Sequence, residues 1–227
     1  MLLKSIPQTK EDMNHYLESE AIMIALAEKL NEDKEYWGML GLLYDIDWAL
    51  TKNTENSLLE FSVSPNLKQK PRFEDNVKEH CLKAKEILKE KGFDEEFIET
   101  IQSHGYGFEQ IPTLMKKKRE KKVEHTLASA ETLTGVIYAY ALMRGRKISD
   151  MDVSGLKKKF KDKKFAANCN REIIQEICEI SCLSKSAIDI DTDLQIKEIE
   201  QVGISLDEFF ALAIEAMAGI KDEIGLE

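Results

Sequence analysis

The sequence predicts an all-α protein, and three observations support this fold class. Proline and glycine are scarce, with 4 prolines and 11 glycines among 227 residues, so few positions interrupt a helix. Apolar residues recur at the spacing of a helix face in most segments, whereas the alternation typical of strands has little support. Hydrophobic residues make up 43% of the chain and charged residues 33%, which is typical of a globular protein with a full core.

The first predicted helix runs from about Thr9 to about Leu30. Thr9 followed by Asp12 is typical of a helix N-terminus, where a hydroxyl caps the first turn and an acidic residue is favoured. His15 shares a helix face with Ile22, which lies two turns later in an apolar stripe. We therefore expect the side chain of His15 to point inward.

The segment Gly38–Trp48 is almost wholly apolar and predicts a central buried helix that ends near Trp48 or Leu50. Asp45 lies beside the buried face of this helix, and a buried carboxylate without a partner is very unfavourable. The polar and irregular stretch Thr51–Arg72 predicts a long loop of the kind that often forms a lid or a binding segment.

Two further helices each carry an inward-facing histidine. A helix over about Phe73–Lys91 should stop at Gly92, and His80 lies on its apolar stripe. The next helix is capped by Asp94 and places His104 on its buried side. Three of the 4 histidines in the chain are thus predicted to face the core from separate helices.

A strong helix over about Glu120–Met143 completes the predicted first domain, residues 1–145, and carries Glu131 beside its buried stripe. Residues 146–227 are expected to form a C-terminal helical extension packed on that domain. The extension should hold three helices, near Val153–Phe160, after the Asn170 cap, and over about Leu206–Ile224 behind a Ser205–Glu208 capping box. Ser184–Ile199 has no clear period and receives no assignment.

The net charge of −10 argues against a general nucleic-acid-binding protein, which would be basic. The basic runs Lys116–Lys122 and Lys157–Lys164 read as solvated faces, with phosphate steering and weak nucleic-acid binding left open. Met1–Lys10 lacks the apolar core of a signal peptide, and the apolar run Leu133–Met143 is too short to span a bilayer. The cysteines form no disulfide framework, so we expect a cytoplasmic protein with no membrane partner.

Five polar residues are thus predicted to project from apolar helix faces: His15, Asp45, His80, His104 and Glu131. A lone histidine on such a face is usually a satisfied core residue, but imidazoles together with carboxylates suit a divalent Mn, Fe, Co, Ni or Zn ion. Such an ion would also supply the partner that Asp45 needs. The alternative is a metal-free core in which the hydroxyl of Tyr44 bonds Asp45.

The order of these residues resembles the HD superfamily of metal-dependent phosphohydrolases over about Lys10–Met143. The matching stretches are Asn14–Glu20, Leu42–Trp48, Glu79–Ala84, Gln102–Gly105 and Ala130–Gly135. The resemblance implies an HD-domain-like helical bundle that holds one or two metal ions. Tyr44 stands where the family has the histidine of its His-Asp pair, and Glu131 stands where it has the final aspartate.

On the residue map that the resemblance implies, His15, Asp45 and Glu131 hold a first ion at a site damaged by Tyr44. Asp45, His80 and His104 hold a second ion at an intact site, with Asp45 bridging the two. A phenol near Asp45 stays protonated at neutral pH, because the pKa of tyrosine is about 10, and binds divalent ions poorly.

The activity implied by the resemblance is hydrolysis of a phosphate ester or anhydride in a nucleotide or another small phosphorylated compound, with Asp45 as the catalytic residue. Lys52, or a lysine of the Lys116–Lys122 run, is the candidate to hold the substrate phosphate. The alternative is a catalytically inactive HD-fold protein that binds a nucleotide or a protein partner, and Tyr44 is the feature that separates the two hypotheses. A homodimer is left open.

Overall fold

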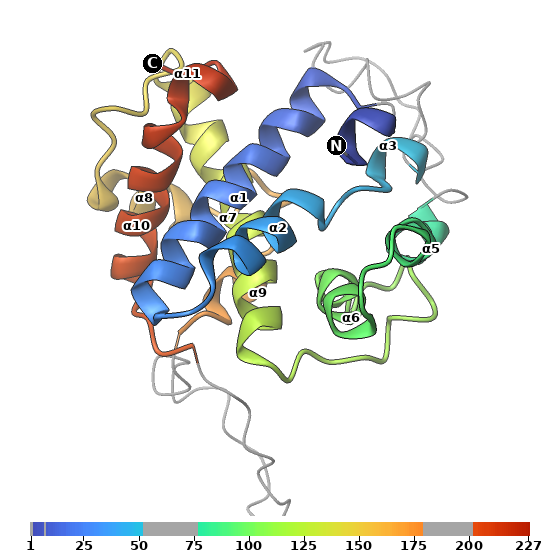
Figure 1. Ribbon diagram of the computed structural model, residues 1–227. Helices are drawn as coiled ribbons and strands as arrows, with labels where there is room; N and C mark the ends of the chain where they lie inside the picture. Colours follow the sequence, from blue (N-terminus) through green and yellow to red (C-terminus); the bar gives the residue numbers. More distant parts are fainter. Residues whose placement is uncertain (1, 7, 52–76, 179–201) are drawn as a thin grey trace, which may run out of the picture. The chain divides into compact units, whose positions relative to one another are not determined.

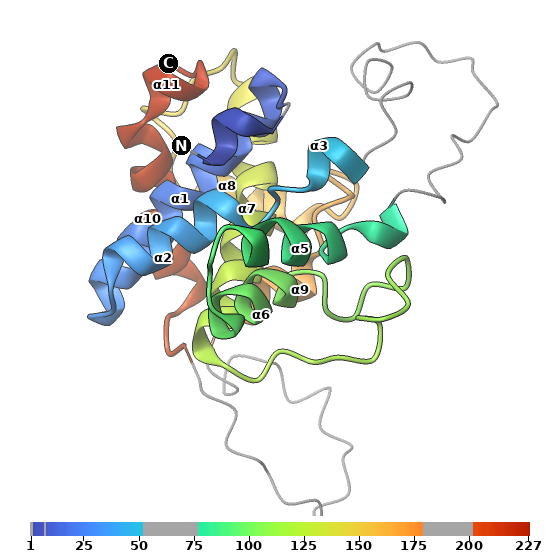
Figure 2. The same cartoon turned by 45° about the vertical axis from the view of Figure 1, so that its right-hand side comes forward.

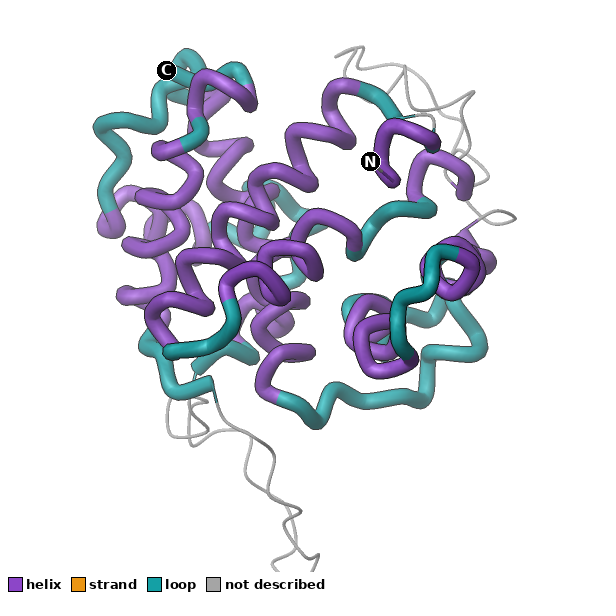
Figure 3. The backbone as a smooth tube through the Cα atoms, viewed as in Figure 1, coloured by secondary structure: helices purple, strands orange, loops and turns teal. Residues whose placement is uncertain are grey.

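The computed structural model describes residues 2–6, 8–51, 77–178 and 202–227, and every regular element in these ranges is a helix (Figures 1 and 3). The prediction of an all-α protein is therefore confirmed for the described residues. Lys52, the predicted loop from residue 52 to residue 72, and Ser184–Ile199 lie outside these ranges. The elements are η1 Leu2–Ser5, α1 Lys10–Leu30, α2 Lys34–Leu43, α3 Trp48–Thr51, η2 Val77–Glu79, α5 Leu82–Glu90, α6 Glu95–Ser103, α7 Lys122–Met143, α8 Val153–Lys161, α9 Arg171–Gln175, α10 Leu206–Gly219 and α11 Lys221–Ile224.

The chain divides into two compact units. Unit 1 consists of Met1–Asp12 and Leu43–Lys118, and unit 2 consists of Met13–Leu42 and Arg119–Glu227. The division at residue 145 that the sequence predicts, between a catalytic domain and an extension, stays a prediction. None of the described helices has the length and apolar character that crossing a membrane requires.

Helix α7 is the core element of unit 2 and packs against α8, α9 and α10. Its buried side chains lie all around the helix rather than on one stripe, which is the pattern of a helix enclosed by its neighbours. Glu227 is hydrogen-bonded to the segment that follows α7. Its carbonyl accepts from the amide nitrogens of Ile148 and Ser149 at 2.7 and 3.2 Å. The predicted Ser205–Glu208 capping box at the start of α10 is present.

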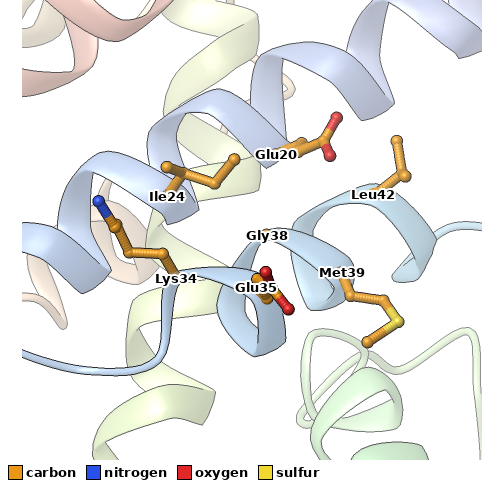
Figure 4. Close-up of a pocket in the computed structure, with 7 residues that line it drawn as sticks. All are labelled: Glu20, Ile24, Lys34, Glu35, Gly38, Met39 and Leu42. Atoms are coloured by element: carbon orange, nitrogen blue, oxygen red, sulfur yellow. The ribbon is translucent and has the colours of Figure 1, made fainter.

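Helices α1 and α2 approach each other closely within unit 2 because glycines line the contact. A Cβ atom on Gly41 would lie 2.7 Å from the carbonyl oxygen of Ser19 and 2.9 Å from the nitrogen of Glu20. A Cβ atom on Gly38 would lie 2.8 Å from the Ile24 side chain. Beside this contact an open hollow of about 410 Å³ is lined by residues of both helices, which are Glu20, Ile24, Lys34, Glu35, Gly38, Met39 and Leu42 (Figure 4).

Helix α9 is held on α7 by a partly buried polar network around Glu176. Arg119 donates two hydrogen bonds of 2.7 Å to the two oxygens of Glu176, and Nδ1 of His125 lies 2.7 Å from one of them. The hydroxyl of Ser129 donates to the carbonyl of Ile173 at 2.8 Å. Burial acts to raise the pKa of Glu176, but the hydrogen bonds from Arg119 and His125 outweigh it and lower that pKa to about 2.

Unit 1 contains the short α5 and α6, which pack against each other (Figure 2). The N-cap predicted at Asp94 is present, because its side chain accepts from the amide of Phe97 at 2.8 Å. The end of α6 at Ser103 makes His104 the C-cap residue.

Three predicted helices are interrupted in the structure. The central helix ends at Leu43 rather than near Trp48 or Leu50, and a turn over residues 44–47 follows it. The helix predicted over Phe73–Lys91 is broken after His80, because Cys81 has φ 65° and a left-handed residue cannot continue an α-helix. The predicted final helix is broken at Ile220, whose φ of −113° separates α10 from α11.

Replacing Gly41 by Ala should destabilise the protein, because the added methyl group collides with backbone atoms of α1 that cannot rotate away. We expect the free energy of unfolding, measured by urea denaturation, to fall by about 1–3 kcal/mol. The control is Gly219→Ala in α10, where an added Cβ meets nothing within 4 Å and should stabilise the helix by about 0.5–1 kcal/mol. An unchanged unfolding midpoint for Gly41→Ala would contradict the close approach of α1 and α2.

The network around Glu176 should make stability depend on pH. Its pKa is about 2 in the folded protein against an ordinary 4.5, so the ionised carboxylate stabilises the fold above pH 4.5. This contribution is lost as the pH falls from 4.5 toward 2 and the carboxylate becomes protonated. Glu176→Gln should therefore lower the melting temperature at neutral pH. The difference in melting temperature between this variant and the wild type should become smaller as the pH falls from 4.5 toward 2. The control is Glu172→Gln, which removes an exposed carboxylate one turn earlier. Its melting temperature should not change relative to the wild type over the same pH range.

Candidate metal centre

Unit 1 brings the side chains of Asp45, His80 and His104 to one buried point. The Nε2 atoms of the two histidines lie 3.0 Å apart. Asp45 Oδ1 lies 3.2 Å from Nε2 of His80 and 3.8 Å from Nε2 of His104. All three residues are at most 8% exposed. The structure therefore brings together three of the five residues singled out in the sequence.

The ends of secondary-structure elements, rather than helix faces, position these side chains. Asp45 lies in the turn after Leu43, and its carbonyl accepts from the amide of Trp48 at 2.9 Å as α3 begins. His80 lies in the turn between η2 and α5. His104 follows the last residue of α6. Because each residue sits where a helix starts or stops, its side chain projects into the space between elements.

The second nitrogen of each imidazole has an acceptor that orients the ring. Nδ1 of His80 lies 3.0 Å from Oδ1 of Asp47, and Nδ1 of His104 lies 2.6 Å from the carbonyl oxygen of Ile101. The other oxygen of Asp47 accepts from the amide of Ala84 at 3.1 Å. Since a carboxylate and a carbonyl only accept, each Nδ1 carries a proton, and in a neutral ring Nε2 then presents a lone pair.

Two Nε2 lone pairs facing each other at 3.0 Å, beside a carboxylate oxygen, repel unless a cation lies among them. Burial alone lowers the pKa of His80, because it disfavours the charged ring. Interactions with Cys81, Asp47 and Asp45 outweigh burial, so the pKa of His80 lies well above its ordinary value. The pocket thus favours positive charge at this point, which a proton on His80 or a metal ion would supply.

The spacing of the donor atoms fits a single metal ion. Nitrogen and oxygen ligands about 2.0–2.2 Å from one ion lie roughly 2.9–3.5 Å from each other. The separations of 3.0, 3.2 and 3.8 Å among Asp45, His80 and His104 lie at or near this range. With Asp47 and Cys81, which are also buried, these residues offer the donor atoms that could hold a metal ion.

Aromatic rings enclose the two imidazoles. The ring of Tyr44 stands edge-on to His104 with the centroids 5.1 Å apart, and Trp48 stands in the same way to His80 at 5.3 Å. Tyr44 is 1% exposed, so it is part of the core at this point. Edge-on packing of this kind is a favoured geometry for aromatic rings.

His15 and Glu131 both belong to unit 2. Nδ1 of His15 lies 3.0 Å from the hydroxyl of Thr134, which itself donates to the carbonyl oxygen of Glu131 at 2.6 Å. His15 also lies 3.7 Å from Glu18, whose pKa burial raises although His15 acts to lower it. The structure therefore places His15 against α7 one turn from Glu131. That these two residues share an ion with Asp45 stays a prediction.

Two residues of this centre, Asp47 and Cys81, are not among the metal ligands that the sequence predicts. From its place two residues beyond Asp45, near the end of the predicted helix, Asp47 is expected to point elsewhere and to be solvated. That expectation is wrong, because Asp47 is fully buried and accepts from both His80 and Ala84. The sequence gives no role to Cys81, yet its Sγ lies 3.6 Å from Nε2 of His104. The signal for Asp47 was a second acid two residues after Asp45 in an apolar segment, and the turn at residues 44–47 turns both acids toward His80.

Asp47→Asn should weaken metal binding by about 10–100-fold, because an amide has one acceptor oxygen where Asp47 uses two, for Nδ1 of His80 and for the Ala84 amide. The substitution also removes the negative charge that supports His80 as a metal ligand. Isothermal titration calorimetry with Zn²⁺ or Co²⁺ measures the change. The control Asp94→Asn keeps a good helix cap and should bind metal as the wild type does. Wild-type affinity in Asp47→Asn would show that Asp47 does not orient a metal ligand.

Comparison with known proteins leaves this centre to be interpreted from its own geometry. Neither a protein-family model, nor a curated protein, nor a solved structure matches the chain. A proposal for the function therefore depends on the arrangement of Asp45, His80 and His104 and on the resemblance of the residue order to that of the HD superfamily.

Proposed function

We propose that the protein is a metal-dependent phosphohydrolase of the HD type, acting on a phosphate ester or anhydride in a small phosphorylated compound such as a nucleotide. The observation that carries this proposal is the approach of Asp45 Oδ1 and the Nε2 atoms of His80 and His104, at 3.0–3.8 Å from one another. These are the residues that the resemblance assigns to the intact metal site. An HD-like helical bundle is part of the same proposal.

Each residue of the centre has a distinct task in this mechanism. His80 and His104 present lone pairs whose direction is set by Asp47 and by the Ile101 carbonyl. A divalent ion held there would supply Lewis-acid chemistry, polarising a phosphoryl oxygen and making water a nucleophile near neutral pH. Both oxygens of Asp47 accept hydrogen bonds, from His80 and from the Ala84 amide. Asp45 is the catalytic residue that the resemblance implies, and we assign to it proton transfer from the attacking water.

A lysine near the centre would hold the substrate phosphate. Lys117, in the basic run Lys116–Lys122, lies over the ring of Tyr106 with its Nζ 5.2 Å from the centroid. Tyr106 packs in the same buried cluster as Cys81, so this contact links Lys117 to the neighbourhood of the two histidines. Lys117 therefore joins Lys52 as the candidate for binding a phosphate oxygen.

One observation favours the second candidate function, a catalytically inactive HD-fold protein that binds a nucleotide or a protein partner. Tyr44 stands where the resemblance expects a metal-binding histidine, and its ring is buried against His104. A phenol supplies a poor ligand for a divalent ion at neutral pH. The pocket would then keep its shape while holding fewer ions than a two-metal hydrolase needs.

Phosphatase assays separate the two functions. The full chain is purified without chelator, its metal content is measured, and hydrolysis of p-nitrophenyl phosphate and of a panel of nucleotides is followed with Mn²⁺, Co²⁺, Ni²⁺, Fe²⁺ or Zn²⁺. We expect Asp45→Ala and His104→Ala to lose kcat/KM by about 100-fold or more, because each removes a metal ligand. His125→Ala, a histidine of unit 2 bonded to Glu176, should keep the activity.

The absence of turnover in protein that binds one equivalent of metal would reject the hydrolase and favour the binding function. The absence of any metal binding would reject the metal centre itself, since a proton on His80 would then account for the close approach of the two Nε2 atoms.

A further inference from the structure

We infer that Cys81 ligates the same ion through its sulfur, so that the centre selects zinc over manganese and magnesium. This inference rests on the proposed metal centre and names the ion that it holds. Sγ of Cys81 lies 3.6 Å from Nε2 of His104, and the donor atoms of His80, Cys81 and His104 all lie within 4.8 Å of one another. For about 2.05 Å from zinc to nitrogen and about 2.3 Å to sulfur, a tetrahedral ion separates these ligands by roughly 3.5 Å.

The backbone at Cys81 is held in a conformation that a cysteine does not favour. Its φ of 65° and ψ of −24° lie in the left-handed region, where glycine or asparagine is the usual residue. Cys81 is also the N-cap residue of α5, yet its side chain makes no capping hydrogen bond. Neither backbone preference nor capping explains a cysteine here, whereas the left-handed turn sends its sulfur toward His104. Strained residues of this kind cluster at functional sites.

Gly105 provides the space that the sulfur occupies. A Cβ atom on Gly105 would lie 2.7 Å from Sγ of Cys81, so the sulfur would have to move to admit any other residue there. The φ of Gly105 is not positive, so its backbone conformation does not itself demand glycine. His104 thus supplies the donor atom Nε2, and Gly105 leaves the space that Sγ of Cys81 occupies.

The surroundings of Cys81 favour a soft metal ion. The residue is 0% exposed and packs with Tyr106, Ile111 and Leu114, so on this side the sulfur meets apolar groups. Burial raises the pKa of the Cys81 thiol, so it is a bound metal ion that would stabilise the thiolate. Thiolate and imidazole ligands favour zinc, whereas manganese and magnesium favour oxygen. Binding displaces the thiol proton to solvent as the sulfur–metal bond forms.

The inference is tested by loading the full chain with Co²⁺ and recording its absorption spectrum. We expect a near-ultraviolet charge-transfer band from thiolate to cobalt beside the visible ligand-field bands. Cys81→Ser should lose the charge-transfer band and keep ligand-field bands from the two histidines and Asp45. It should also lower zinc affinity by about 100-fold or more while changing manganese affinity by less than about 10-fold.

Cys169→Ser is the matched control. Cys169 also lies beside a glycine, since a Cβ atom on Gly135 would come within 2.7 Å of its sulfur, but it belongs to unit 2 and should leave the spectrum unchanged. X-ray absorption of the zinc-loaded wild type gives a second measurement that needs no variant. We expect one sulfur ligand at about 2.3 Å.

The outcomes separate this inference from the proposed function. An ion bound by nitrogen and oxygen alone, or a charge-transfer band that persists in Cys81→Ser, overturns ligation by Cys81 and leaves the hydrolase proposal standing. A sulfur ligand in a protein without phosphatase activity supports ligation by Cys81 and rejects the hydrolase. If no ion binds at all, both the ligation by Cys81 and the hydrolase function are rejected. The contact between Cys81 and His104 is then a hydrogen bond of a buried thiol.

Discussion

Two imidazole nitrogens face each other 3.0 Å apart in a buried pocket that also contains two aspartates. This contact depends on the hydrogen bonds made by the opposite side of each ring, to Asp47 and to the Ile101 carbonyl. Because those bonds place the protons on Nδ1, the lone pairs converge and repel unless positive charge lies between them. The chemistry proposed for the centre follows from this one electrostatic constraint.

The centre is built where regular structure stops. The turn after Leu43 presents Asp45 and Asp47, the left-handed Cys81 separates η2 from α5, and His104 caps the end of α6. Side chains at consecutive positions of a helix point about 100° apart and cannot converge, whereas a break in the helix allows neighbours to do so. The interruptions of the predicted helices are therefore the features that assemble the donor atoms.

Tyr44 limits the number of donor atoms at this centre. Tyr44 packs edge-on to His104 and adds bulk and low polarity where a histidine would add another donor. In unit 2, His15 and Glu131 are held near each other through Thr134 on α7. The candidate metal centre lies in unit 1, where Asp47 and the Ile101 carbonyl orient its two imidazoles.

The sequence alone determined the all-helical class, most helix positions and the caps at Asp94, Asn170 and Ser205, because these depend on residues within one or two turns of each other. It also singled out Asp45, His80 and His104 as inward-facing. Only the tertiary structure decided that Asp47 and Cys81 join them, since their approach depends on a turn and a left-handed residue rather than on helical periodicity. The partners of these groups lie 23 to 37 residues away in the chain, and local sequence patterns carry no information on such pairings.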